Sequence, residues 1–134
     1  MAVSATYPCD DDRIARARAA TREFLARTAT VFPGTVSRHA EEAAQLVVSE
    51  LVTNARKYAP GPSHLTLTRT AEAVHVTVED TSPHLPRPHG TDPLRPGQHG
   101  LEIVVALCRA LDVRRAAAGK RVTAVLDLTQ PRAA

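Results

Sequence analysis

The chain has 134 residues, of which 43% are hydrophobic and 23% are charged. This length fits a single domain, and the balance of residues excludes a disordered or collagen-like polymer. The net charge of +3 comes without a run of five or six like charges, and aromatic residues make up only 3% of the chain. We therefore expect neither a nucleic-acid partner nor base recognition by aromatic stacking.

Cysteine usage and hydropathy together predict a cytoplasmic protein. Cys9 and Cys108 are far apart, and neither has a Cys or His neighbour at metal-ligand spacing, so both are expected to be free thiols. No segment approaches the roughly 18 uninterrupted apolar residues that a membrane span needs. Residues 1–12 also lack an apolar stretch preceded by positive charge, so we expect no signal peptide and no membrane contact.

Two amphipathic helices are predicted in the first half of the chain. Aspartates at positions 10–12 supply helix-start chemistry, and apolar residues recur at helical spacing over 11–29. Pro33 and Gly34 break this pattern, which returns over 36–58 and ends at Pro60. The apolar positions of the second helix are Ala40, Ala43, Ala44, Val47, Val48, Leu51, Val52 and Ala55.

In the second half of the chain, the spacing of apolar residues changes from a helical pattern to the alternation typical of strands. Apolar and polar residues alternate over 65–67 and 74–78, which predicts two strands joined by a short turn. Prolines and glycines then exclude regular structure over about 81–99, and a loop of this length is often a functional lid. A third helix is predicted from near Gly100 to Leu111, followed by a hairpin formed by 113–115 and 122–128.

This order of elements predicts one α/β domain over 1–134, a two-layer sandwich with helices packed on one face of a sheet. The core should combine apolar residues of the strands with one stripe from each of the second and third helices. Its expected members are Leu65, Leu67, Val74, Val76, Val78, Val122 and Val125 or Leu126 on the sheet, and Val47, Leu51 and Val104 on the helices.

Three polar features could carry chemistry. Glu50 and Asn54 lie four residues apart, so their side chains share one side of the second helix, where they could hold a metal ion or orient a hydroxyl, or form an idle surface pair. Asp80 follows a strand directly and could accept a hydrogen bond from a ligand amine or cap a turn. Gly97 and Gly100 precede the third helix, which permits either a phosphate site or only a tight turn.

Four segments in order resemble one family. They are residues 49–55 (SELVTNA), 76–83 (VTVEDTSP), 97–104 (GQHGLEIV) and 119–122 (GKRV). Together they resemble the small ATP-binding proteins of the anti-sigma-factor kinase group, within the superfamily of gyrase B, Hsp90, histidine kinases and MutL. The resemblance extends over roughly residues 35–128 and implies a Bergerat-type fold, a mixed β-sheet under helices.

The resemblance also implies roles for individual residues. Asn54 would coordinate Mg²⁺ bridging the ATP phosphates, Asp80 would accept a hydrogen bond from the adenine amino group, and Glu50 would be the general base. Residues 81–99 would form the ATP lid. The remaining nucleotide-binding residues implied by the resemblance are Gly97, His99, Gly100 and Leu101.

By the same resemblance, the expected function is that of an anti-sigma-type serine/threonine protein kinase. Its partner would be a small antagonist protein that carries the acceptor hydroxyl, and a sigma factor could be a second partner. The sequence leaves open whether the chain forms a homodimer, and it does not identify either partner.

Departures from the common family pattern keep two alternatives open. Asp80 is followed by Thr81, Ser82 and Pro83, where many relatives have a glycine-containing motif, and Gln98 and His99 stand where many have Gly and Arg. Arg121 stands where a Thr is common near the adenine. The first alternative is a non-catalytic ATP-dependent binding module. The second, a detached histidine-kinase catalytic domain, lacks a phosphoacceptor helix in this chain.

Overall fold

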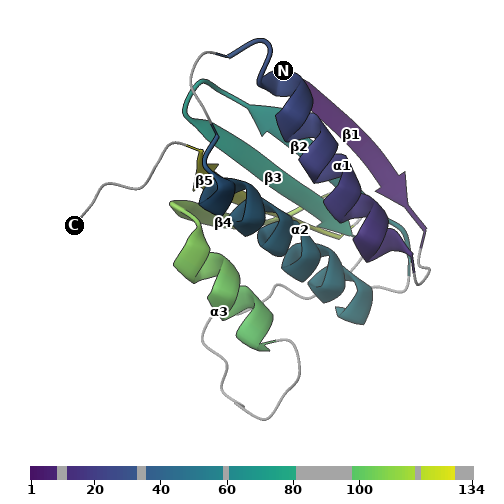
Figure 1. Cartoon of the computed structure of the whole chain (residues 1–134). Helices are drawn as coiled ribbons and strands as arrows, with labels where there is room; N and C mark the ends of the chain where they lie inside the picture. The colour runs from purple at the N-terminus through teal and green to yellow at the C-terminus, as the bar shows by residue number, and fades with distance from the viewer. Residues whose placement is uncertain (9–11, 33–35, 59–60, 81–97, 117–118, 129–134) are drawn as a thin grey trace.

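A computed structural model of the chain describes residues 1–8, 12–32, 36–58, 61–80, 98–116 and 119–128. In this part of the chain, three helices lie on one face of a five-stranded sheet (Figure 1). The elements in chain order are β1 (Ala2–Tyr7), α1 (Arg13–Thr28), α2 (Arg38–Tyr58), β2 (Ser63–Arg69), β3 (Ala73–Asp80), α3 (Gln98–Leu107), β4 (Ala110–Arg115) and β5 (Lys120–Asp127). The predicted two-layer α/β sandwich is therefore confirmed.

The strands are arranged in the order β1-β2-β3-β5-β4, and every described pairing is antiparallel. The expectation of a mixed sheet is therefore wrong for this part of the chain. The physical reason lies in the connection through α3. This helix joins β3 to β4, which run in the same direction, but β5 returns between them and pairs with both, so the two parallel strands never touch.

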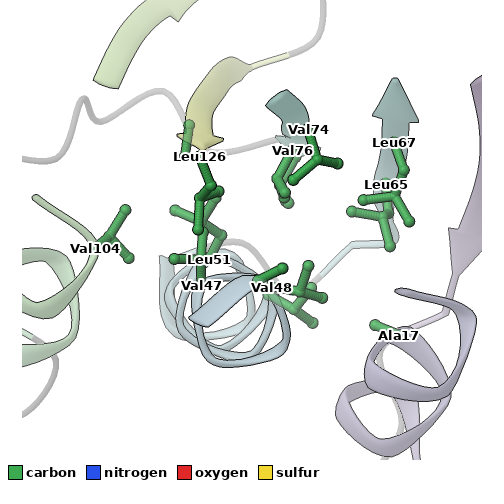
Figure 2. Close-up of a cluster of buried hydrophobic side chains, with 14 of the residues drawn as sticks. Ala17, Val47, Val48, Leu51, Leu65, Leu67, Val74, Val76, Val104 and Leu126 are labelled. Carbon is green, nitrogen blue, oxygen red and sulfur yellow. The ribbon is translucent and has the colours of Figure 1, made fainter. Parts of the chain in front are cut away.

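The core lies between the sheet and α2, which occupies the centre of the helical layer (Figure 2). The alternating residues of β2, β3 and β5 point toward the helices and are buried, because side chains on a strand alternate between its two faces. Val47 and Leu51 of α2 and Val104 of α3 complete this core. The predicted core residues are confirmed, with Leu126 rather than Val125 buried on β5.

The structure differs most from the sequence-based expectation at β1 and at the end of α3. Strand β1 was not expected, because its residues are mostly exposed and its pairing partner β2 lies about 60 residues away in the sequence. Helix α3 ends at Leu107 rather than Leu111. Leu111 instead lies in β4, which begins at Ala110 and pairs with β5. The apolar spacing around Leu111 is also compatible with a helix, but pairing with β5 makes this segment a strand.

No helix in the described ranges combines the length and the apolar character that crossing a membrane demands.

Candidate functional site

Two hydrogen bonds fix the direction of α2 relative to the sheet. The Ser37 amide, just before α2, donates to the Leu128 carbonyl at 3.3 Å, and the Leu128 amide donates to the Glu72 carbonyl at 2.8 Å. The start of α2 therefore lies beside the start of β3, and both elements run toward the same end of the molecule (Figure 1). Asn54 lies about 26 Å along α2 from Ser37 at the helical rise, and Asp80 about 26 Å along β3 from Glu72 at the strand rise.

Helix α3 is fixed in the same way but runs in the opposite direction. The Arg109 amide, just after α3, donates to the Val125 carbonyl at 2.7 Å, and Val125 pairs with His75 of β3. The first residue of α3, Gln98, lies about 17 Å from Arg109 along the helix. Asp80 lies about 17 Å from His75 along β3. The fold therefore brings the C-terminal half of α2, the end of β3 and the start of α3 to one end of the sandwich.

The predicted pair on α2 lies at the edge of its buried face. Glu50 is half-buried, and Asn54 is 8% exposed. The carboxamide of Asn54 has an oxygen that accepts and an NH₂ group that donates hydrogen bonds, so at this edge it can contact a ligand.

The helical turn that carries Glu50 is tied to α1. Ser49 Oγ donates to the Gln45 carbonyl at 2.9 Å and accepts a hydrogen bond of 2.9 Å from Arg18 Nη1 on α1. The residue before Glu50 is therefore held from two sides, which restricts how this part of α2 can rotate.

Asp80 ends β3 on the face that points toward the helices and is 5% exposed. Lys120 begins β5, stands directly opposite Asp80 in the strand pairing and is 1% exposed. Its Nζ atom lies 2.5 Å from Asp80 Oδ2. A buried carboxylate thus stands where the sequence predicts the adenine contact, but with an ammonium group beside it that the sequence analysis missed.

Arg121, the next residue along β5, points away from Asp80. Arg121 lies on the opposite face of β5 from Lys120, because neighbouring strand residues point to opposite faces. Its Nε atom lies 2.5 Å from Glu79 Oε1, and the two side chains are 50% and 35% exposed. Lys120 is therefore the residue of the 119–122 segment that faces Asp80.

The other predicted binding residues lie at and just before the start of α3. Gly97 and residues 81–97 of the predicted lid (81–99) lie outside the described residues, whereas Gln98 and His99, which were predicted to end the lid, are the first two residues of α3. His99 and Gly100 lie in the first turn of α3, and Leu101, in the same turn, is buried. Because the first amide groups of a helix have no partner within it, this turn can donate hydrogen bonds to an anion.

A magnesium ion would need few ligands from this chain. The described residues contain no group of three or more His, Cys, Asp or Glu side chains placed to share a metal. Mg²⁺ in nucleotide sites is usually held by one or two side-chain oxygens together with water and phosphate oxygens. The carboxamide oxygen of Asn54 fits this mode, and Glu50 lies one helical turn away from it.

Comparison with known proteins places this fold in a defined class. A model of the histidine kinase-like ATPase domain matches residues 7–126. The chain therefore belongs to the histidine kinase-like ATPase domain family, which confirms the superfamily that its sequence segments resemble. The sequence has no significant match among curated proteins.

A solved structure is similar in fold. It is described as the crystal structure of the RsbU and RsbW domains of Rv1364c from Mycobacterium tuberculosis, and it matches with a TM-score of 0.72 at 18% sequence identity. The match covers 98% of this chain and 33% of that chain, so this chain spans about a third of the length of the chain it matches. At this identity, the similarity establishes the fold.

Proposed function

We propose that the chain binds ATP with Mg²⁺ at the end of the sandwich where β3 ends and α3 begins. One observation carries the proposal: the carboxylate of Asp80 is buried at the end of β3, level with Asn54 and with the first turn of α3, in a histidine kinase-like ATPase fold. Asp80 contributes a contact to the base, Asn54 a metal ligand, and the first turn of α3 hydrogen-bond donors to the phosphates. A nucleotide-binding site needs these three kinds of contact.

Each residue then has a separate task. Asp80 accepts a hydrogen bond from the amino group of the base. The first turn of α3, which includes His99, Gly100 and Leu101, holds phosphate oxygens together with Gly97, the residue before the helix, and the positive end of the helix dipole adds attraction. Asn54 holds the Mg²⁺, which when bound offsets the negative charge of the phosphates.

We further propose that the chain acts as an anti-sigma-type regulator and phosphorylates a Ser or Thr of a small antagonist protein. Glu50 supports this proposal because a carboxylate at the edge of the buried face can accept the proton of an incoming hydroxyl while remaining accessible to a partner. The similarity in fold to a chain containing an RsbW domain also favours it. A sigma factor is the second partner expected on this basis, and a homodimer is the assembly to test.

The kinase proposal is tested with purified antagonist-type proteins of the same organism, each incubated with this protein and Mg-ATP labelled on the γ-phosphate. We expect Ser or Thr labelling that Glu50→Gln abolishes. Glu42→Gln is the matched control, because Glu42 is exposed on the same helix and pairs with Arg38 at 3.5 Å. An antagonist that binds normally and is never labelled would end the kinase proposal.

A non-catalytic ATP-dependent binding module is the second candidate. The observation that favours it is the Asp80–Lys120 ion pair. The pair places a charged group beside the proposed base contact, and neither residue has a proposed catalytic role. In this case Glu50→Ala leaves both partner binding and regulatory output intact. In the kinase case the same variant keeps partner binding and loses the output that depends on phosphorylation.

A further inference from the structure

Strands β1 and β4 form the two edges of the sheet, since the strand order is β1-β2-β3-β5-β4 (Figure 1). In the part of the chain that the structure describes, β4 pairs with β5 alone, so the backbone groups along its other side have no strand partner there. An edge of this kind can pair with a strand of another chain. Charged side chains usually protect an edge strand from such pairing, and β4 carries three, Asp112, Arg114 and Arg115.

The side chains of β4 divide between the two faces of the sheet. Asp112 and Arg114 lie on the face away from the helices, where Arg114 Nε is 2.7 Å from Asp112 Oδ2 and the side chains are 55% and 73% exposed, respectively. Leu111 and Val113 lie on the helix-facing side, where both are half-buried against the core. This edge therefore presents opposite charges on one face and partly exposed apolar side chains on the other.

The order of these charges permits one register of self-pairing. Two copies related by a twofold axis pair their β4 strands antiparallel, and since opposite residues in a sheet share a face, the axis passes through a residue that meets its own copy. A pairing centred on Asp112 or on Arg114 brings like charges together on the axis, which destabilises it. A pairing centred on Val113 places Asp112 of each copy opposite Arg114 of the other, and the two Val113 side chains meet on the helix-facing side.

We propose that β4 is a homodimer interface, in which two copies of the chain pair their β4 strands antiparallel about Val113 and their sheets become continuous. Asp112 of each copy then forms an ion pair with Arg114 of the other. The charges that protect this edge against other strands thus select a second copy of the same strand. The inference rests on the homodimer contained in the proposed function, but it requires neither nucleotide binding nor phosphorylation.

The test is sedimentation equilibrium of the full chain over a range of concentrations, with the folding of each variant checked by circular dichroism. We expect the wild type to be in equilibrium between monomer and dimer. Asp112→Arg places two arginines opposite each other, and Arg114→Asp places two aspartates opposite each other, each at two symmetry-related positions. Either variant should therefore raise the dissociation constant of the dimer at least about tenfold.

Mixing the two variants separates pairing between chains from an effect on folding. In a mixed dimer, one strand carries arginine at both positions and the other carries aspartate at both, so opposite charges face each other again. We expect the mixture of Asp112→Arg and Arg114→Asp to dimerise about as tightly as the wild type, which a folding defect in either variant would prevent. Glu42→Arg is the matched control and should leave the dimer unchanged, because Glu42 is 68% exposed on α2 and pairs with Arg38.

The outcomes distinguish this inference from the rest of the proposed function. A wild type that stays monomeric at every concentration would overturn the β4 interface, and titration of the same protein with Mg-ATP would test nucleotide binding separately. A dimer that persists in both single variants, or a mixture that fails to regain it, would also overturn the inference. Loss of the dimer in Val3→Lys alone would place the interface at β1, the other edge of the sheet, where Val3 is 37% exposed.

Discussion

Two ion pairs on neighbouring rungs of the same two strands differ mainly in burial, and this predicts different contributions to stability. Lys120–Asp80 and Arg121–Glu79 each have a nitrogen–oxygen distance of 2.5 Å. The first pair is 2% exposed at both side chains, and the second is 50% and 35% exposed. Lys120→Met and Arg121→Met therefore remove equivalent contacts from opposite faces of one sheet.

The magnitudes follow from what each substitution leaves behind. Without Lys120, the Asp80 carboxylate stays buried without that cation, and losing one partner of a buried pair costs about 3–5 kcal/mol. Without Arg121, Glu79 turns toward water, and exposed pairs are worth only about 0–1 kcal/mol. Because a domain of this kind is stabilised by about 5–15 kcal/mol in total, the first variant should lose a large fraction of its stability.

Urea unfolding followed by circular dichroism measures both effects. We expect Lys120→Met to lower the unfolding midpoint strongly with little change in the slope m, and Arg121→Met to leave the midpoint nearly unchanged. Equal effects of the two substitutions, or a Lys120→Met variant as stable as the wild type, would refute the reasoning that burial determines the cost.

Two further predictions concern packing and thiol chemistry. Val104→Ala should lower the free energy of unfolding by about 2 kcal/mol, because the Val104 side chain of α3 is fully buried in the core. Val105→Ala should lower it by less than about 0.5 kcal/mol, because Val105 is 46% exposed. Urea unfolding of the two variants measures both effects. Burial raises the pKa of the Cys108 thiol above its ordinary value of 9.0, since it disfavours the thiolate. In a Cys9→Ser variant, alkylation of Cys108 should therefore be slower at neutral pH than in the urea-unfolded chain and should accelerate above pH 9.0, and equal rates in both states would contradict this.

The strongly periodic segments were the predictable part of the fold. Helix α2 and the strands β2, β3 and β5 carry long apolar patterns, and the same patterns identified Leu51, Val76 and the other buried residues. Strand β1 could not be predicted in this way. Its side chains alternate weakly, and its existence depends on pairing with β2, a contact between distant parts of the chain.

The candidate site shows the same division between local and long-range information. Glu50 and Asn54 share one side of a helix by local geometry, which a sequence displays directly. The neighbour of Asp80 depends instead on the register between β3 and β5. Alternation along the strand places Lys120 on the same face as the predicted core residue Val122, but the pairing of Lys120 with Asp80 joins residues 40 positions apart, which no local pattern displays.

The most direct test of the central claim is a calorimetric titration of ATP and ADP with Mg²⁺ into the wild type and Asp80→Ala, with folding of both checked by circular dichroism. We predict saturable binding to the wild type that a folded Asp80→Ala variant loses, because the base contact is gone. No binding to folded wild-type protein, or equal binding to both proteins, would contradict a nucleotide site at the end of β3.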